Sequence, residues 1–270
     1  MLETIKETAS FIKGKTSCNP DVAIILGTGL GGLADDVQIT ACLNYTDIPG
    51  FPESTAPGHS GKLIFGCLGG KEVMVMQGRF HYYEGYTMEE ITFPVRVMKY
   101  LGVKYLFISN ASGGMNPDFS IGDLMIINDH INLLPNPLIG KHYPEFGDRF
   151  PDMSEPYSLS LIAKALRIAG ENRIKVHTGC YVGVTGPTLE TPREYFYFRT
   201  IGGDTVGMST VPEVIVAHQM GIPCFAISII TDLGIAGRIV KVSLNDVQEA
   251  AAKSAPVMTF LMEKLIGELE

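Results

Sequence analysis

Polar or small residues follow five segments that have the composition of buried strands. They are Thr28, the group Arg79, His81 and Tyr83, then Ala111, Glu190 with Met208 and Ser209, and Asp232. Because α/β proteins bind ligands beyond the carboxyl ends of strands, these side chains are candidates for one shared site. A guanidinium, an imidazole and hydroxyl groups can together hold a phosphate and a sugar. The pattern therefore predicts a ligand site that accepts a small anion.

Glu190 lies within the most informative stretch, residues 181–215. An apolar run rich in β-branched residues, 181–185, predicts a buried strand that breaks at Gly186. Glu190 follows the break, just ahead of a helix-like segment, 193–200. A carboxylate at a helix start is also stabilised by the helix dipole, so a purely structural role for Glu190 stays open.

A glycine-rich loop, residues 27–32, follows a strand predicted over 21–26. Such a loop can turn backbone N–H groups toward an anion, and Thr28 adds a hydroxyl donor. Its glycines also fit the GxGxxG pattern of dinucleotide-binding oxidoreductases, with Asp47 about 20 residues further on. Residues 38–45 alternate like a strand, however, and leave too little room for the helix of a βαβ unit. An oxidoreductase is therefore a remote alternative, and a simple turn is another.

Arg79, His81 and Tyr83 follow a β-hairpin predicted from residues 62–67 and 71–76. Alternate side chains of extended backbone share a face, so these three would point the same way. Alternatively, Arg79 and His81 are exposed residues of an edge strand and Tyr83 is partly in the core. The first interpretation predicts that these three side chains bind a phosphate and a sugar.

The composition limits the class of protein. The chain has 270 residues, 46% of them hydrophobic, and no linker or repeat divides it, so we expect one domain over residues 1–270. A formal net charge of −8 argues against nucleic acid as a partner. No apolar run approaches the roughly 20 residues of a membrane span, and the N-terminus lacks the apolar core of a signal peptide. Five scattered cysteines, mostly in apolar runs, predict reduced core residues and a cytoplasmic protein.

Helical and strand patterns alternate along the chain and predict an α/β fold. Thr87 with Glu90 gives a capping-box signal for a helix to about residue 101, and Ser243 with Asp246 caps a last long helix. Further buried strands are predicted over 104–109, 123–128 and 223–230.

Two segments between these elements are predicted to be loops. Residues 110–114 form a run of small residues, and residues 130–157 are irregular and rich in proline, with Phe146 and Phe150 expected at the surface. A loop as long as the second usually has a function or forms an interface.

Six motifs, in order along nearly the whole chain, resemble those of the trimeric, low-molecular-mass purine nucleoside phosphorylases. They read GTGLGGL, APGHSGKL, QGRFHYYEGY, NASGGMNP, GPTLETP and VGMSTVPEV. The resemblance implies a single α/β domain with a twisted, mixed central β-sheet flanked by helices. It implies phosphate-dependent cleavage of purine ribonucleosides and deoxyribonucleosides, chiefly inosine and guanosine, to free base and the sugar 1-phosphate. No metal or organic cofactor would be needed, and the enzyme would be a homotrimer.

The resemblance also assigns roles to individual residues. Phosphate would contact Thr28, His59, Arg79, His81, Ala111 and Ser209. The ribose would contact Tyr83, Met208 and Leu244, with Phe150 reaching in from the neighbouring subunit. The base would contact Leu189, Glu190, Val206, Thr231 and Asp232. The catalytic set would be His81, Glu190 and Asp232, with Glu190 accepting from the purine N1–H and Asp232 facing N7 and the 6-substituent.

Three positions depart from the family pattern. Asp232 stands where Asn is usual, and an ionised Asp offers only acceptors. Either Asp232 is protonated and donates to a 6-oxo group, or the preference broadens toward 6-aminopurines, as Asp at this place in the methylthioadenosine phosphorylases suggests. Leu189 replaces an aromatic residue over the base. Leu244 aligns with a His that meets the 5′-hydroxyl, so a 5′-deoxy or 5′-thio group would be tolerated.

These departures leave alternatives for the function. A methylthioadenosine or adenosine phosphorylase is the main one, favoured by Asp232 and Leu244. A nucleoside-binding protein without turnover is a weaker one, because Arg79, His81 and Glu190 are all in place.

Overall fold

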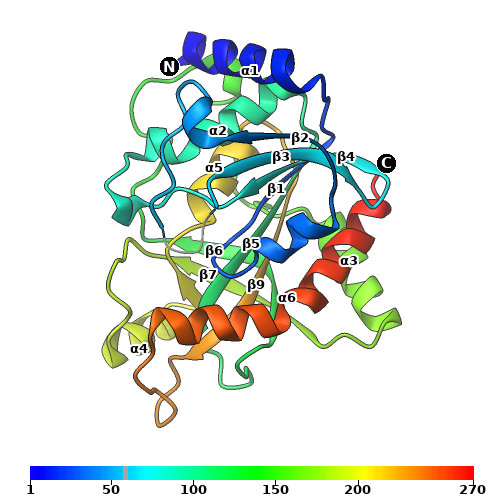
Figure 1. Ribbon diagram of the computed structural model, residues 1–270. Coiled ribbons are helices and arrows are strands. Elements are labelled where there is room, and N and C mark those ends of the chain that lie inside the picture. Colours follow the sequence, from blue (N-terminus) through cyan, green and yellow to red (C-terminus); the bar gives the residue numbers. More distant parts are fainter. Residues whose placement is uncertain (57–59) are drawn as a thin grey trace.

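The computed structural model describes residues 1–56 and 60–270 (Figure 1). The nine strands of this part of the chain form one mixed sheet in the order β2-β3-β4-β1-β5-β8-β7-β6-β9. This confirms the expected single-domain α/β fold with a mixed sheet. The strands are β1 Val22–Ile25, β2 Gln38–Asn44, β3 Lys62–Leu68, β4 Lys71–Gln77, β5 Tyr105–Gly114, β6 Leu124–Asn132, β7 Val176–Gly183, β8 Thr205–Gly207 and β9 Cys224–Leu233.

The first half of the sheet is built on β1, whose four residues are all buried. β1 pairs in parallel with β4 on one side and with β5 on the other. β3 and β4 form the predicted hairpin, with Lys62 opposite Gln77 and Leu68 opposite Lys71. β2 adds an antiparallel outer strand next to β3.

The second half of the sheet closes on itself. β9 pairs with β6 and also with β5, so that β5, β8, β7, β6 and β9 form a ring of hydrogen-bonded strands. Within this ring β5 and β9 run parallel to each other, and β8 runs antiparallel to β5. Closure removes the exposed edges that an open sheet would leave here and fixes these five strands relative to one another.

Helices cover the sheet on both sides. Helices α1 and α2 pack together, and α2 packs on α5, whereas α3 packs on α6 elsewhere on the surface (Figure 1). The helices are α1 Leu2–Thr16, α2 Met88–Leu101, α3 Leu159–Glu171, α4 Pro192–Thr200, α5 Val211–Gln219 and α6 Leu244–Gly267. Short 3₁₀ helices lie at η1 Gly31–Asp36, η2 Tyr45–Asp47, η3 Tyr82–Glu84 and η4 Pro144–Phe146.

Both predicted capping boxes are present. Thr87 accepts from the Glu90 backbone at the start of α2, and Ser243 does the same with Asp246 at the start of α6. Helix α6 contains Pro256 and changes direction along its length (Figure 1), as expected where proline removes a backbone hydrogen bond.

Several sequence-based expectations were wrong. Residues 110–114 are not a loop, because β5 continues through them and pairs with β9. Phe146 is buried, with 1% of its surface exposed, whereas Phe150 is 88% exposed as predicted. Cys42 is exposed rather than in the core, although all five cysteines are free thiols. In the described part of the chain, none of the helices combines the length and the apolar character that crossing a membrane requires.

Candidate active site

One cavity of about 380 Å³ brings most of the predicted site residues together. Its lining includes Thr28, Arg79, His81, Tyr83, Ala111, Leu189, Glu190, Val206, Met208, Ser209, Thr231, Asp232 and Leu244. His59 lies outside the described residues. Phe150 does not line this cavity and instead borders another hollow together with His130 and Ile215. The chain thus gathers segments from residue 28 to residue 244 around one space.

The strand directions explain this convergence. β1, β4, β5 and β9 all run parallel, so Thr28 after β1, Arg79 after β4 and Asp232 near the end of β9 meet at one edge. β8 runs the other way and pairs with the last residues of β5, where Gly113 lies opposite Val206. The chain after β8 therefore returns alongside β5 and brings in Ser209. The sequence predicted a mixed sheet but not which strand runs in the opposite direction.

Arg79 is a buried cation in the wall of the cavity, with only 2% of its surface exposed. Its Nη2 donates to the carbonyl oxygens of Ser109 and, at 3.3 Å, Ile25. Its Nη1 lies 3.6 Å from Oε1 of Glu213, whose side chain is equally buried. Glu213 was missed, although a single acid within the apolar run VPEVIVA is a signal for a buried ion pair. These contacts hold the guanidinium in place at the inner wall of the cavity.

Thr210 connects Arg79 to the residues after β8. Its hydroxyl accepts from Arg79 Nη1 at 3.2 Å and from Asn110 Nδ2 at 2.9 Å, and it lies 3.2 Å from the hydroxyl of Ser209. The backbone of Thr210 has φ 69° and ψ −51°, and the amide of Val211 donates to the carbonyl of Ser209 at 2.7 Å. This is a γ-turn with positive φ, a strained conformation for a β-branched residue and one that is typical of functional sites.

His81 is oriented by Glu84. Its Nδ1 lies 2.9 Å from Oε1 of Glu84, which also accepts from the His81 backbone amide at 2.8 Å. Burial alone would raise the pKa of Glu84, but hydrogen bonds from His81 and Thr55 outweigh burial and lower it to about 2. An ionised Glu84 fixes Nδ1 and with it the orientation of the imidazole ring, which lines the cavity. Glu84 was also missed, although it stands three residues after His81.

Tyr83 is not on an extended strand as predicted, because it belongs to the 3₁₀ helix η3. Its ring nevertheless stacks on that of His81, with centroids 4.7 Å apart and planes tilted by 18°. Burial is the main reason that the pKa of Tyr83 is raised to about 12, so its hydroxyl remains a neutral donor and acceptor. The predicted grouping of the three side chains is therefore present with a different backbone geometry.

Two carboxylates form the opposite part of the lining. Glu190 is half-buried, and burial is the main cause of a raised pKa, to which the charge of Asp232 adds. Asp232 is buried and accepts from the hydroxyl of Tyr195 at 2.9 Å and from that of Thr231 at 3.1 Å. Tyr195, on α4, is a third residue that the sequence argument missed.

The two parts of the cavity are separated along β5. The Arg79 guanidinium binds the carbonyl of Ser109, and Asp232 pairs in register with Gly113. These positions are four residues apart on one strand, which corresponds to roughly 13 Å. That separation suits an elongated ligand with an anion at one end and polar ring atoms at the other. Leu189 and Leu244, each about half exposed, and the buried Val206 supply apolar walls.

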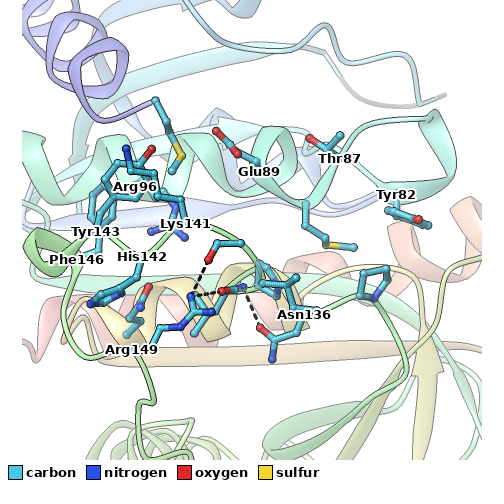
Figure 2. A pocket seen from close by; sticks show the side chains of 18 residues that line it. Tyr82, Thr87, Glu89, Arg96, Asn136, Lys141, His142, Tyr143, Phe146 and Arg149 are labelled. Carbon is cyan, nitrogen blue, oxygen red and sulfur yellow. Dashed lines mark hydrogen bonds between the residues drawn. The ribbon is translucent and has the colours of Figure 1, made fainter.

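A second cavity, of about 450 Å³, has a different character (Figure 2). It lies between α2 and the loop 135–149, and its wall includes Arg96 stacked over the Phe146 ring at 4.6 Å. Arg149 donates to the carbonyls of Leu138 and Gly140, at 2.9 and 3.1 Å (Figure 2). Its lining contains no pair of carboxylates and none of the strand-end residues predicted from the sequence.

The dinucleotide interpretation of the glycine loop is wrong. The loop is followed by the 3₁₀ helix η1 and then by β2, which pairs antiparallel to β3 at the sheet edge. A βαβ unit would require an α-helix and a parallel strand at this point. Asp47 lies in η2 and does not border the cavity.

Comparison with known proteins agrees with this geometry. A family model described as the phosphorylase superfamily matches residues 21–267. Purine nucleoside phosphorylase 1 of Bacillus subtilis is 47% identical over 271 residues, covering 100% of both chains. Solved structures of the Schistosoma mansoni purine nucleoside phosphorylase with adenosine and with inosine both give a TM-score of 0.94, at 44% and 43% identity. They cover 99% of this chain and 98% and 97% of theirs. The chain therefore belongs to the phosphorylase superfamily and, within it, to the purine nucleoside phosphorylases.

Proposed function

We infer that this chain cleaves purine nucleosides with inorganic phosphate to give the free base and ribose 1-phosphate. The observation that carries the inference is a single cavity with buried Arg79 in one part and the carboxylates of Glu190 and Asp232 in another. A guanidinium and hydroxyl groups suit phosphate, and carboxylates suit the N–H groups of a purine. The names of the related proteins and the inosine bound to one of them support the same reaction.

The residues divide between the reactants. We assign Thr28, Arg79, His81, Ala111 and Ser209 to phosphate, with His59 as a further contact. Tyr83, Met208 and Leu244 would hold the ribose. Leu189, Glu190, Val206, Thr231 and Asp232 would hold the base. His81, Glu190 and Asp232 would have the catalytic roles, because they touch the groups whose charge changes.

The reaction follows from this division. A phosphate oxygen forms a bond to C1′ while the C1′–N9 bond breaks, and the bonding electron pair leaves with the base. The ribosyl group becomes oxocarbenium-like, and the adjacent phosphate dianion stabilises it. N7 of the departing purine takes up a proton from solvent, which relieves the developing negative charge and is balanced by the proton that hydrogen phosphate loses on becoming the sugar phosphate. Asp232 would accept a hydrogen bond from the resulting N7–H. Arg79, held by Ser109, Thr210 and Glu213, needs no rearrangement to bind the phosphate.

We propose inosine and guanosine as the main substrates, because an ionised Glu190 can accept from the N1–H that both carry. Adenosine and methylthioadenosine remain the alternative class, since Asp232 presents acceptors and Leu244 is an apolar neighbour for a 5′-substituent. Phosphate would itself be the nucleophile, so we propose that no metal or organic cofactor takes part and that chelators leave the activity unchanged.

We also propose that the enzyme is a cytoplasmic homotrimer in which Phe150 completes the neighbouring ribose site. An aromatic side chain that is 88% exposed suits burial against a partner. Sedimentation equilibrium is expected to give three times the chain mass. Phe150→Ala is expected to raise the KM for inosine several-fold without changing the KM for phosphate, whereas an effect on phosphate alone would contradict the assignment.

The assay that tests the function follows release of free base from inosine, guanosine, adenosine and methylthioadenosine, with and without phosphate. We expect turnover only with phosphate and ribose 1-phosphate in equal amount to the base. Release of free ribose instead would indicate hydrolysis and would overturn the proposal. A methylthioadenosine rate far above the inosine rate would identify the alternative activity.

A further inference from the structure

Tyr195 connects the proposed base-binding carboxylates to the helix behind them. It lies on α4, which begins two residues after Glu190, and only 5% of its surface is exposed. Its hydroxyl donates to Oδ2 of Asp232 at 2.9 Å. Nothing in the assigned reaction requires a tyrosine here, so its position calls for a separate explanation.

Two glycines pack closely against the Tyr195 side chain. A Cβ added at Gly234 would lie 2.1 Å from Cδ1 of Tyr195, so a residue with a side chain there would collide with the ring. A Cβ added at Gly113 would lie 3.0 Å from Asp232 Oδ2 and 3.4 Å from the Tyr195 hydroxyl. Both glycines therefore make room for the hydrogen-bonded pair, which is a packed part of the structure.

Both oxygens of Asp232 serve as acceptors within the protein. Oδ2 accepts from Tyr195, and Oδ1 accepts from the hydroxyl of Thr231 at 3.1 Å. A carboxylate has further lone pairs but no proton to give. A 6-aminopurine offers this side chain two donors, N7–H in the leaving base and the amino group. A 6-oxopurine offers it one donor, N7–H, and one acceptor, the 6-oxo oxygen. That oxygen cannot hydrogen-bond to a carboxylate, which is also an acceptor.

We propose that Tyr195 is a positioning and specificity-determining residue. By holding Asp232 as an acceptor against the purine, its hydroxyl raises the adenosine-to-inosine ratio of kcat/KM above the value that the enzyme would have without it, even with inosine as a main substrate. The proposal rests on the proposed phosphorolysis and adds a residue that chooses among its substrates. Tyr195 acts through Asp232 and does not itself touch the base. Without the hydroxyl, one Asp232 oxygen loses its fixed donor and can carry a proton toward a 6-oxo group.

The test compares kcat/KM for adenosine and inosine in the wild type and in Tyr195→Phe, which keeps the ring and its packing. We expect the adenosine-to-inosine ratio to fall about tenfold, the effect of one hydrogen bond to a charged group. Tyr197→Phe is the matched control, because Tyr197 lies on the same helix and is 53% exposed. That control is expected to leave the ratio unchanged.

A second comparison separates positioning from general support of the fold. In an Asp232→Asn background, Tyr195→Phe is expected to change the adenosine-to-inosine ratio less than about twofold. If Tyr195 affects the ratio only through the Asp232 carboxylate, removing its hydroxyl has little further effect once that carboxylate is gone. Equal losses for both nucleosides in Tyr195→Phe, or the same change of ratio with and without Asp232, would overturn the proposal.

Binding of the product bases supplies a measurement that does not depend on turnover. Calorimetry with adenine and hypoxanthine should show the same shift in relative affinity between the wild type and Tyr195→Phe, and an unchanged relative affinity would overturn the proposal. Absence of phosphorolysis of any nucleoside by the wild type would instead defeat the proposed function, and the base affinities would still decide the role of Tyr195.

Discussion

Two of the cavities in the described part of the chain are similar in size and opposite in construction. The cavity at the strand ends, of about 380 Å³, draws its lining from β5, β9 and the segments after β1, β4, β7 and β8. The cavity between α2 and the loop 135–149, of about 450 Å³, is lined mostly by that loop and its neighbours (Figure 2). The proposed reaction is assigned to the smaller cavity. Volume is therefore a poor guide to function here, and the origin of the lining is a better one.

The difference lies in what the polar groups are bound to. In the loop cavity, Arg149 binds carbonyls of the same loop, and the Asn136 side chain accepts from the Leu138 amide at 2.9 Å. These contacts hold the loop itself together. In the strand-end cavity, residues distant in sequence hold one another, as Arg79 and Glu213 do. Changes in the strand-end cavity should therefore alter catalysis, and changes in the loop cavity should alter stability.

The largest effect is expected for Arg79→Lys. Lysine keeps the charge but cannot reproduce the forked contacts to Ser109, Thr210 and Glu213. We expect kcat/KM for phosphate to fall about 10³-fold, near the upper end for loss of one preorganised donor. Steady-state phosphorolysis with varied phosphate measures this, with the exposed Arg193→Lys as control. A loss of less than about tenfold would show that Arg79 is not the main phosphate-binding residue.

Phe146→Ala tests the loop cavity. The Phe146 ring is 1% exposed and supports Arg96. Its removal should cost about 3 kcal/mol of unfolding free energy, as for other buried aromatics. Chemical denaturation measures the loss, and Phe196→Ala, at a position 65% exposed, serves as control. We expect kcat/KM to stay within about twofold of the wild type at temperatures where the variant is folded. A fall in kcat/KM without loss of stability would reverse the contrast between the cavities.

Glu190→Gln tests the base side of the strand-end cavity. An amide can still accept at N1–H but carries no charge, so we expect kcat/KM for inosine to fall about 10²-fold. The KM for phosphate should not change, and Glu194→Gln, on the exposed surface of helix α4 that follows Glu190, is the control. Since burial raises the pKa of Glu190, the wild-type activity with inosine should fall on acidification at a pH above 4.5, the ordinary value. If the activity of Glu190→Gln also falls on acidification in this range, the decline is due to the titration of another group.

Glu84→Gln is expected to have the smallest effect and a specific pH dependence. The pKa of Glu84 is about 2 in the folded protein and about 4.5 when unperturbed, so its ionised form stabilises the fold above pH 4.5 and loses this effect as the pH falls toward 2. At pH 7 the variant should lose about 2 kcal/mol, because glutamine retains part of the hydrogen bonding. The difference in unfolding free energy from the wild type should shrink between pH 4.5 and 2. A constant difference would mean that the carboxylate charge is unimportant.

Much of the fold was predictable because its signals are local. The apolar run of β1, the β3–β4 hairpin and the capping boxes at Thr87 and Ser243 each depend on neighbouring residues. Closure of the ring by β5 and β9 was not predictable, because it depends on pairing between residues more than 100 positions apart. The small residues at 110–114 looked like a loop because glycine and alanine lack strand propensity, yet two neighbouring strands hold them extended.

The site was predictable at the residues that face the cavity and not at those behind them. Arg79, His81 and Glu190 stand out because polar side chains follow apolar strands. Glu84 and Glu213 support them from positions that carry no special pattern except an isolated charge. Tyr195 looked like an ordinary helix residue, since its contact with Asp232 arises only when α4 packs against the end of β9.

In the proposed reaction, the extended strand β5 sets the distance between the phosphate site and the base site. The anchor for the phosphate side and the anchor for the base side sit at Ser109 and Gly113 of the same strand. Insertion or deletion of one residue between them would change the separation by about 3.3 Å and turn every later side chain to the opposite face. Exchange of a side chain that faces the cavity, such as Asp232, would leave this separation unchanged, because the backbone of β5 sets it.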